Sequence, residues 1–502
     1  MGASHFTYDL AAGEQFRDSL EAVKKAEKEN PVKKDSVNGA DKDAEEPVFE
    51  ADEFRVPLKY RQDIPKGTLL LAGARLITME GDTVHESGDL LIRDNRIAAL
   101  GPAGSLQIPE GTEVRDMSGK TIVPGFVDTH AHMWPAWGIH KNRIWIYGAN
   151  LAYGVTTTRD PQTATTDVLT YSDMVNAGMM PGPRIYSTGP GVGYWRYKLT
   201  SLEHTKKVLR QYSEYYDTKT IKMYLTGNRK HRQWVIMAAK ELGLMPTTEG
   251  GLDFKLNMTQ LLDGYPGHEH SLPIYPIYND VVRTIADAGM AVTPTLLVAY
   301  GGPWAENYFY ATEDVWGDSK IRHFTPYEEL ASKSRRRPGW FMDEEHVFEK
   351  HAEFMKDLVD AGGLAGIGSH GQLQGLGYHW ELWSVASSGM ENSDALRVAT
   401  LLGARSLGLD GDLGSLKAGK LADLVILDAN PLDDLRNTNT VRYVVKNGRM
   451  YEAETLDAVW PDMRKAPTYL WQAEPPEGLP GTGQSLRSGS GNSSGHGTRS
   501  DG

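Results

Sequence analysis

Short apolar runs alternate with amphipathic stretches through the middle of the chain, from about residue 123 to residue 405. Eight of the runs predict buried β-strands, because each is short, apolar and bounded by turn-forming residues. They are IVPGFVDTH, YGVTTTRD, PRIYSTG, KTIKMYL, LMPTTEG, GYPGHEH, MAVTPTLLV and LAGIGSH. The stretches between them, such as VVRTIADAG, run into Gly, as helix C-termini commonly do. Eight strand–helix repeats predict an α/β fold, a (β/α)8 TIM barrel. The alternative is a doubly wound open sheet, but no Gly-rich phosphate-binding turn follows the first strand.

β-rich segments flank the predicted barrel (residues 123–405) on both sides. Residues 61–122 and 406–465 contain short alternating strands separated by turns, such as GDLLIRDNRIAALG and VRYVVKNGRMY. We therefore expect a small composite β-sandwich domain built from both ends of the chain. Residues 1–60 are charge-dense and predict a mobile N-terminal arm, and the Gly/Ser-rich residues 472–502 predict a flexible tail.

Composition narrows the classes of function. The chain has 502 residues, 53 Lys and Arg against 66 Asp and Glu, a net charge of −13 and no cysteine. Without cysteine, thiolate metal sites and cysteine nucleophiles are excluded, so any metal must bind nitrogen and oxygen. The acidic balance disfavours nucleic acid and anionic membranes as partners and favours a small-molecule substrate. No segment has the roughly 20 apolar residues of a membrane span, and the first residues lack the pattern of a signal peptide. We expect a soluble protein of undetermined compartment, with export of a longer precursor as an alternative.

Two histidines mark the end of the first predicted strand. In FVDTHAH the strand period of two puts Asp128, His130 and His132 on one face. Two imidazoles on one face can converge on a metal ion, although such pairs are also common on protein surfaces. The C-terminal end of a barrel strand is where barrel active sites lie, which favours the metal-binding interpretation.

Later strand ends carry further candidate ligands. Strand four ends near Lys222, strand five at Glu249, strand six at His268 and His270, and strand eight at His370. A buried lysine is costly unless it is paired or chemically modified; the alternative is a lysine at a strand edge whose amine reaches solvent. Each histidine taken singly can be an ordinary core or surface residue. Five of eight strand ends with nitrogen or oxygen ligands nevertheless favour one shared site.

Long motifs at both ends of the predicted barrel domain resemble the metal-dependent amidohydrolase superfamily. They are GARLITMEGD, GKTIVPGFVDTHAH, LGSLKAGKLADLVILDANPL and VVKNGRMY. Further motifs resemble the amidohydrolase portion of the TolB-propeller-linked subfamily: LAYGVTTTRDPQT, YDTKTIKMY, LMPTTEGGLD, DGYPGHEHSLP, TPTLLVAYGGPWAENY and GSHGQLQGLGYHWELW. The resemblance covers about residues 52–470. It implies one or two divalent ions, commonly Zn²⁺ with Mn²⁺ or Co²⁺ as alternatives, and a β-propeller domain or chain as a partner. The resemblance also implies a homo-oligomer.

The resemblance also assigns roles to the strand-end residues. His130 and His132 would bind the first ion, Lys222 would bridge two ions as its carbamate, and His270 would be the ligand from strand six. His268 would be a neighbour that orients it.

The sequence departs from the superfamily pattern on two strands. Strand five, which normally supplies a histidine, carries Glu249, which can still bind a metal through oxygen. Strand eight, which normally supplies an Asp that accepts a proton from the attacking water, carries His370. We expect His370 to be the catalytic proton-transfer residue; an imidazole can instead bind metal, but not do both through one nitrogen.

The predicted function is metal-dependent hydrolysis of a C–N bond in an amide or cyclic amide by a metal-activated water. The alternatives are dipeptidase or prolidase-like activity, ester or lactone hydrolysis, and a catalytically altered barrel that acts as a binding or scaffold partner of a propeller. Residues near the strand ends could contact substrate or support the ligands: Arg159, Asp160, Tyr378 and His379. The aromatic ones among them could equally be packing residues.

Overall fold

The computed structural model describes residues 4–29, 47–133, 141–193, 197–335 and 341–472. The chain divides into two units, Met1–Ala466 and Pro467–Gly502. In the second unit the structure describes residues 467–472, which include the short 3-10 helix η6 (Leu470–Gln472). The predicted tail, apart from Gln472, lies outside the described residues.

Parallel strands form the centre of the first unit. One sheet has the order β10 (Arg184–Ser187), β9 (Val155–Asp160), β8 (Phe126–Asp128). The other contains β11 (Val192–Gly193), β12 (Thr220–Tyr224), β13 (Met245–Glu249), β14 (Gly267–Glu269) and β15 (Ala291–Thr293), in that order and all parallel. Isolated parallel bridges, Asp128 to Ile367 and Val292 to Ala365, place the segment of the eighth predicted strand between β8 and β15. Seven of the eight predicted runs therefore contain strands, and the eighth makes bridges only.

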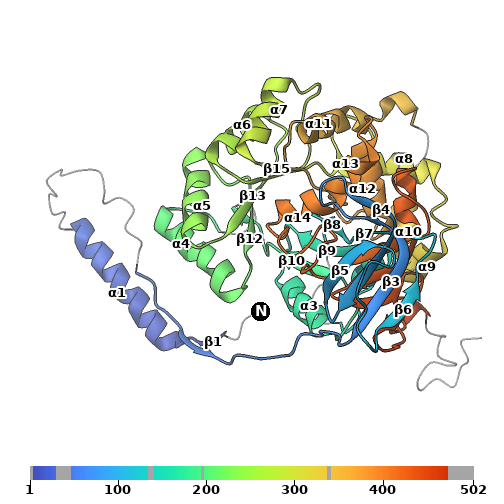
Figure 1. Cartoon of the computed structure of the whole chain (residues 1–502). Coiled ribbons are helices and arrows are strands. Elements are labelled where there is room, and N and C mark those ends of the chain that lie inside the picture. The colour runs from blue at the N-terminus through green and yellow to red at the C-terminus, as the bar shows by residue number, and fades with distance from the viewer. Residues whose placement is uncertain (1–3, 30–46, 134–140, 194–196, 336–340, 473–502) are drawn as a thin grey trace, which may run out of the picture. The chain divides into compact units, whose positions relative to one another are not determined.

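Helices follow the parallel strands, as a strand–helix alternation requires. They are α2 (Trp145–Ala152), α3 (Asp167–Asn176), α4 (Leu202–Arg210), α5 (Arg229–Glu241), α6 (Phe254–Asp263), α7 (Asn279–Ala288), α11 (Phe348–Asp360) and α12 (Leu376–Ala386). Figure 1 shows α4 to α7 on the outside of β12, β13 and β15. The sequence sets the ends of these helices. Asp253 caps the start of α6 by accepting from the Lys255 N–H, and Gly264 ends the helix in the left-handed conformation that glycine adopts without steric cost.

A nine-stranded sheet joins the two flanking β-rich segments. Its strands are β3 (Thr68–Ile77), β4 (Val84–Arg93), β5 (Arg96–Pro102), β6 (Glu113–Asp116), β7 (Thr121–Pro124), β16 (Leu424–Leu427), β17 (Val441–Lys446), β18 (Arg449–Glu452) and β19 (Ala458–Trp460). The antiparallel pair β7–β16 connects the two segments, from Pro124 opposite Leu424 to Thr121 opposite Leu427. Side chains from both segments, such as Leu71, Leu90 and Ile426, share one buried apolar cluster. Burying such apolar surface stabilises the pairing by about 25 cal/mol per Å².

The N-terminal residues form a hairpin and a helix. β1 (Ser4–Thr7) pairs antiparallel with β2 (Asp52–Arg55), and α1 (Leu10–Glu29) lies between them in sequence. The ring of Phe54 stacks on His5, and Phe49 meets the rings of Tyr8 and Phe16. The described residues of this segment thus form a small local element of one helix and two strands.

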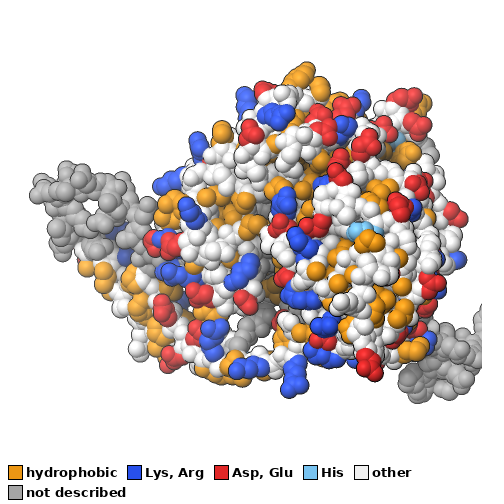
Figure 2. Space-filling view, viewed as in Figure 1, with side chains coloured by type: hydrophobic (Ala, Val, Ile, Leu, Met, Phe, Trp, Pro, Cys, Tyr) orange, Lys and Arg blue, Asp and Glu red, His pale blue; other side chains and the backbone are white. Residues whose placement is uncertain are grey.

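Among the described residues between β15 and α11 there are three α-helices and two short 3-10 helices, η2 (Leu296–Val298) and η3 (Asp343–Glu345). The α-helices are α8 (Ala305–Thr312), α9 (Ser319–Phe324) and α10 (Tyr327–Arg335). Within the described ranges, no helix combines the length and the apolar character that crossing a bilayer requires. Acidic and basic side chains are interspersed over the face shown in Figure 2.

Candidate metal centre

Four histidines from three strand ends converge in the interior. His130 and His132 follow β8, His270 follows β14, and His370 follows the Ala365–Ile367 bridges. The ring centroid of His370 lies 5.0, 4.7 and 5.3 Å from those of His130, His132 and His270. One possible ligand atom from each of His130, His270 and His370 lies within 4.8 Å of the other two. The described residues thus include a group of imidazoles spaced as ligands of one cation.

The first two imidazoles present Nε2 to each other because Nδ1 is engaged elsewhere. The His130 Nδ1–H donates to Glu269 Oε2 at 2.7 Å, and the His132 Nδ1–H donates to Asp160 Oδ1 at 3.4 Å. Their Nε2 atoms lie 3.3 Å apart. A carboxylate on Nδ1 fixes the tautomer that leaves Nε2 free to bind a metal. Two facing lone pairs at this distance fit a cation nearby.

The other two imidazoles are also held through Nδ1. His270 Nδ1 lies 2.6 Å from Thr295 Oγ1, and His370 Nδ1 lies 3.2 Å from the side-chain amide of Gln372. Burial lowers the pKa of His130 and of His370 well below the usual range, and neighbouring positive charges lower both further. Both rings are therefore neutral near pH 7, the form in which imidazole binds metals.

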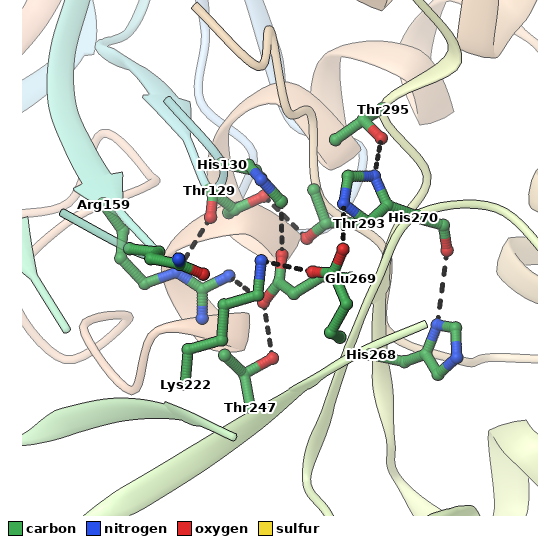
Figure 3. Close-up of polar contacts among 12 residues, drawn as sticks. Thr129, His130, Arg159, Lys222, Thr247, His268, Glu269, His270, Thr293 and Thr295 are labelled. Carbon is green, nitrogen blue, oxygen red and sulfur yellow. Dashed lines mark hydrogen bonds and ion pairs between the residues drawn. The ribbon is translucent and has the colours of Figure 1, made fainter. Parts of the chain in front are cut away.

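Glu269 lies beside the histidine cluster and holds His130 by a hydrogen bond. Its Oε1 accepts from Arg159 Nη2 and from Thr247 Oγ1, each at 2.5 Å, and its Oε2 accepts from His130. Arg159 also donates through Nε to the Thr129 carbonyl at 2.8 Å. Figure 3 shows Arg159, Thr247 and His130 pointing toward Glu269. Glu269 is 1% exposed, and the buried guanidinium of Arg159 balances its charge.

Lys222 and Glu249 form an ion pair beside the histidines. Lys222 Nζ lies 2.5 Å from Glu249 Oε2, and His270 Nε2 lies 3.1 Å from Glu249 Oε1. Burial alone would raise the pKa of Glu249, but the charges of Lys222 and His270 outweigh burial and hold it well below its usual range. The pair accounts for a lysine that is 1% exposed. It also places a carboxylate oxygen at the edge of the imidazole cluster.

Three residues at the site adopt left-handed backbone conformations. They are His270 (φ 73°), Thr295 (φ 48°) and His370 (φ 58°). Backbone hydrogen bonds hold two of them: the His270 N–H donates to the Thr293 carbonyl at 2.8 Å, and the His370 N–H donates to the His130 carbonyl at 2.7 Å. Such conformations are costly for residues other than glycine and cluster at functional sites.

Asp128 ties the first strand end to the eighth. Its Oδ1 accepts from the backbone N–H groups of His130 at 3.1 Å and Ser369 at 3.2 Å. Burial raises the pKa of Asp128 to about 6, against the lowering effect of these hydrogen bonds. Its contacts fix two backbone segments that carry histidines.

Some of the predicted residues take other places. The Tyr378 hydroxyl donates to the Ala399 carbonyl at 2.9 Å. His379 bonds Thr438 Oγ1 at 3.0 Å and the Tyr153 carbonyl at 2.9 Å. These contacts put both side chains in the packing around α12, and the structure does not bring them to the histidine cluster.

His268, Arg159 and Asp160 remain next to the cluster. His268 Nδ1 lies 3.2 Å from the His270 carbonyl, and burial lowers the pKa of His268 to about 4. Arg159 reaches the cluster through Glu269, and Asp160 also accepts the Met133 N–H at 2.9 Å. All three thus contact residues that carry or hold the imidazoles.

Sequence reasoning did not single out Glu269, Thr295, Glu306 or Gln372. Glu269 lies between the two histidines of GHEH. Because successive side chains of a strand point to opposite faces, this position predicts a carboxylate on the face opposite the two histidines. Nothing in the local pattern marks the other three, because Thr295 and Glu306 bond partners that are distant in sequence, and Gln372, although two residues from His370, lies outside any strand or helix period.

Comparisons with known proteins identify the family. A family model, the amidohydrolase family, matches residues 121–451. A guanine deaminase of Escherichia coli (strain K12) is 23% identical over 400 residues, which cover 72% of this chain and 86% of the relative. A 5-methylthioadenosine/S-adenosylhomocysteine deaminase of Symbiobacterium thermophilum is 22% identical over 399 residues, 72% of this chain and 85% of the relative.

Solved structures support the same fold. A Xaa-Pro dipeptidase with methionine bound in its active site matches with a TM-score of 0.60 and 19% identity, over 77% of this chain and all of that one. Molinate hydrolase matches with a TM-score of 0.62 and 16% identity, over 78% of this chain and 95% of that one. At such identities the likeness shows the fold, an α/β TIM-barrel-like domain. Because the family model covers more than half of its length, the chain belongs to the amidohydrolase family and is a metal-dependent hydrolase of carbon–nitrogen bonds.

Proposed function

We propose that the chain hydrolyses an amide or cyclic amide at the histidine cluster, with one or two divalent ions, Zn²⁺ foremost and Mn²⁺ or Co²⁺ as alternatives. The observation that carries the proposal is the convergence of four imidazoles, two buried (His130 and His270) and two half-buried (His132 and His370), whose Nδ1 atoms are engaged by other groups. Zn²⁺ and other late first-row divalent ions bind imidazole nitrogen well.

His130, His132 and His270 are the proposed nitrogen ligands, and Glu249 offers an oxygen ligand at the edge of the cluster. Lys222 is proposed to bridge two ions as its carbamate. An unmodified Lys222 pairs with Glu249, as in this structure, so loading two ions would require bicarbonate. The residues present therefore fit a divalent ion by the chemistry of the donor set.

A bound ion of this kind lowers the pKa of a water and polarises the scissile carbonyl. Protein groups do the remaining work. Glu269 and Asp160 keep His130 and His132 oriented through Nδ1, and Asp128 fixes the two backbone segments that carry His130 and His370. The leaving nitrogen needs a proton, and His370 Nε2 is the candidate that the sequence suggests for this transfer.

Finer features of the proposal rest on the resemblance and on the strand pairings. We infer that the parallel strands close into a (β/α)8 barrel over residues 123–405. β10 pairs with β9 in one sheet, and β11, the next strand in sequence, pairs with β12 in the other, so the chain passes from one sheet to the other between these two strands. Residues 61–122 and 406–465 are proposed to be a composite β-sandwich domain, supported by the β7–β16 pairing. The motifs favour the TolB-propeller-linked subfamily, in which a β-propeller or a homo-oligomeric partner would be expected.

A second candidate activity is cleavage of dipeptides in the manner of prolidases. It is supported by the fold likeness to a Xaa-Pro dipeptidase. The similarity to deaminases supports hydrolysis of a C–N bond for both candidate activities.

Metal analysis tests the proposal directly. The purified chain is analysed for metal after loading with Zn²⁺, Mn²⁺ or Co²⁺ in bicarbonate, and is then assayed on amides, cyclic amides, dipeptides and lactones. We expect one to two equivalents of metal, lost in the double variant His130→Ala/His132→Ala and retained in the control His85→Ala on β4. A parent chain that holds no metal under any of these conditions would refute the proposal and favour the scaffold alternative.

A further inference from the structure

His370 is linked by polar contacts to two further side chains, first Gln372 and then Glu306. His370 Nδ1 meets the side-chain amide of Gln372 at 3.2 Å, and the far side of that amide meets Glu306. Glu306 is fully buried and lies on α8. The three side chains therefore connect the helices after β15 with the histidine cluster.

With Glu306 ionised, the donors and acceptors of these three side chains allow one arrangement of protons. An ionised carboxylate only accepts, so the NH2 group of Gln372 must face Glu306, where it donates to Oε1 at 3.2 Å and Oε2 at 3.3 Å. The amide oxygen of Gln372 then faces His370 and accepts from Nδ1–H at 3.2 Å. A neutral His370 with its proton on Nδ1 has its lone pair on Nε2.

The backbone around His370 is fixed as well. The His370 N–H donates to the His130 carbonyl at 2.7 Å, and Lys333 of α10 donates from Nζ to the carbonyl groups of Gly371 and Gln372. A Cβ atom on Gly371, which has a φ of +72°, would lie 2.3 Å from the His132 carbonyl oxygen. These contacts restrict movement of the backbone at His370, and the Gln372 side chain restricts rotation of the His370 ring.

We propose that Glu306 and Gln372 are positioning residues that hold His370 as a metal ligand through Nε2. The ring of His370 lies within 5.3 Å of the other three imidazole rings, and a ligand atom of His370 lies within 4.8 Å of those of His130 and His270. An imidazole that gives its Nε2 lone pair to an ion cannot use the same atom to carry a proton. The inference rests on the proposed metal centre, and it decides between the two roles that the sequence left open for His370.

Cobalt titration of the metal-free protein separates these possibilities. Co²⁺ is added in bicarbonate buffer, and its dissociation constant and visible absorption spectrum are measured for the wild type, Gln372→Met, Glu306→Gln and the exchange variant Glu306→Gln/Gln372→Glu. In the exchange variant a carboxylate accepts from His370 directly and an amide donates to that carboxylate, so the same tautomer is restored. The matched control is Gln233→Met on α5, whose amide bonds Asp263.

Loss of a hydrogen-bond partner of a metal-binding histidine commonly weakens metal affinity by about 10- to 100-fold. We expect Gln372→Met to weaken Co²⁺ binding by this factor and to change the visible spectrum, and Glu306→Gln to weaken it by about 10-fold. The exchange variant should bind within a few-fold of the wild type with its spectrum, and Gln233→Met should match the wild type.

The outcomes distinguish this inference from the proposed function. If the wild type binds no Co²⁺, both fall. If the wild type binds Co²⁺ and Gln372→Met has the same affinity and spectrum, or the exchange variant is as weak as Gln372→Met, the positioning inference is overturned and the metal centre stands. Circular dichroism checks that each variant is folded; should Gln372→Met fail to fold, Glu306→Gln and the exchange variant decide by the same criteria.

Discussion

Replacing Glu269 by Gln should damage both the stability of the fold and the affinity for metal. Arg159 Nη2 lies 2.5 Å from Glu269 Oε1, and the two side chains are 5% and 1% exposed. Removing the carboxylate charge leaves the guanidinium buried without its counterion. Breaking a buried ion pair by changing one partner costs about 3–5 kcal/mol. Because Gln keeps one acceptor oxygen for Arg159 or Thr247, we expect a loss near the lower end, about 3 kcal/mol.

The same substitution should act on His130. The carboxylate fixes His130 Nδ1–H at 2.7 Å and raises the electron density on Nε2. A neutral amide in its place should weaken metal affinity by about 10- to 100-fold. The two effects are separable, since the first is measured on metal-free protein.

Urea unfolding of the metal-free protein measures the first effect, and Co²⁺ titration of the folded protein measures the second. The matched control is Glu241→Gln, which removes a carboxylate 2.9 Å from Lys206 in an ion pair whose glutamate is 51% exposed. That surface change should cost about 0–1 kcal/mol. The reasoning is refuted if Glu269→Gln loses no more stability than the control, or if adding Arg159→Met to it makes the protein no more stable than Glu269→Gln alone.

Three further predictions concern the site and the core. Gly371→Ala should weaken Co²⁺ binding at least about 10-fold, since its Cβ would lie 2.3 Å from the His132 carbonyl oxygen, whereas Gly362→Ala (φ +79°, open space) should leave binding unchanged. Burial lowers the pKa of His379 to about 3, so this residue contributes stability above pH 6.5 that is lost as the pH falls toward 3. The free energy of unfolding from urea titrations should therefore fall less steeply from pH 7 to 5 in His379→Leu than in the wild type, by up to about 1.4 kcal/mol per pH unit. Zn²⁺ at a hundred times its dissociation constant should stabilise the wild type by about 2.7 kcal/mol in calorimetry, and an equal gain in His130→Ala/His132→Ala would contradict the site.

The strand ends were predictable because parallel strands in one sheet run in the same direction. Strand period and turn residues locate the ends of β8, β13 and β14. β13 and β14 are parallel neighbours in one sheet, and the bridges of Ile367 to Asp128 and of Ala365 to Val292 link β8 to that sheet. That geometry brings His130, Glu249 and His270 together from segments far apart in sequence. The eighth run, LAGIGSH, was predicted to be a strand but makes isolated bridges only. It has two glycines, which weaken a strand because they offer no side chain to pack.

The partners behind the ligands were not predictable from local patterns. Gln372 and Glu306 lie on segments whose relation depends on how α8 packs, and no sequence period encodes that packing. The contacts of Tyr378 and His379 were unpredictable for the same reason. Both lie on α12, which is apolar on nearly every face, so the sequence does not show which face meets the strand ends.

The left-handed conformations of His270, Thr295 and His370 are held by hydrogen bonds within the protein. Each costs about 1–2 kcal/mol for a residue with a Cβ. The hydrogen bonds that oppose this cost are internal to the protein: two join histidine N–H groups to backbone carbonyls, and Glu381 accepts the N–H groups of Leu296 and Leu297 just after Thr295, at 2.7 and 2.9 Å. These contacts fix the backbone that carries the imidazoles, so metal affinity should depend on the groups that orient each ring.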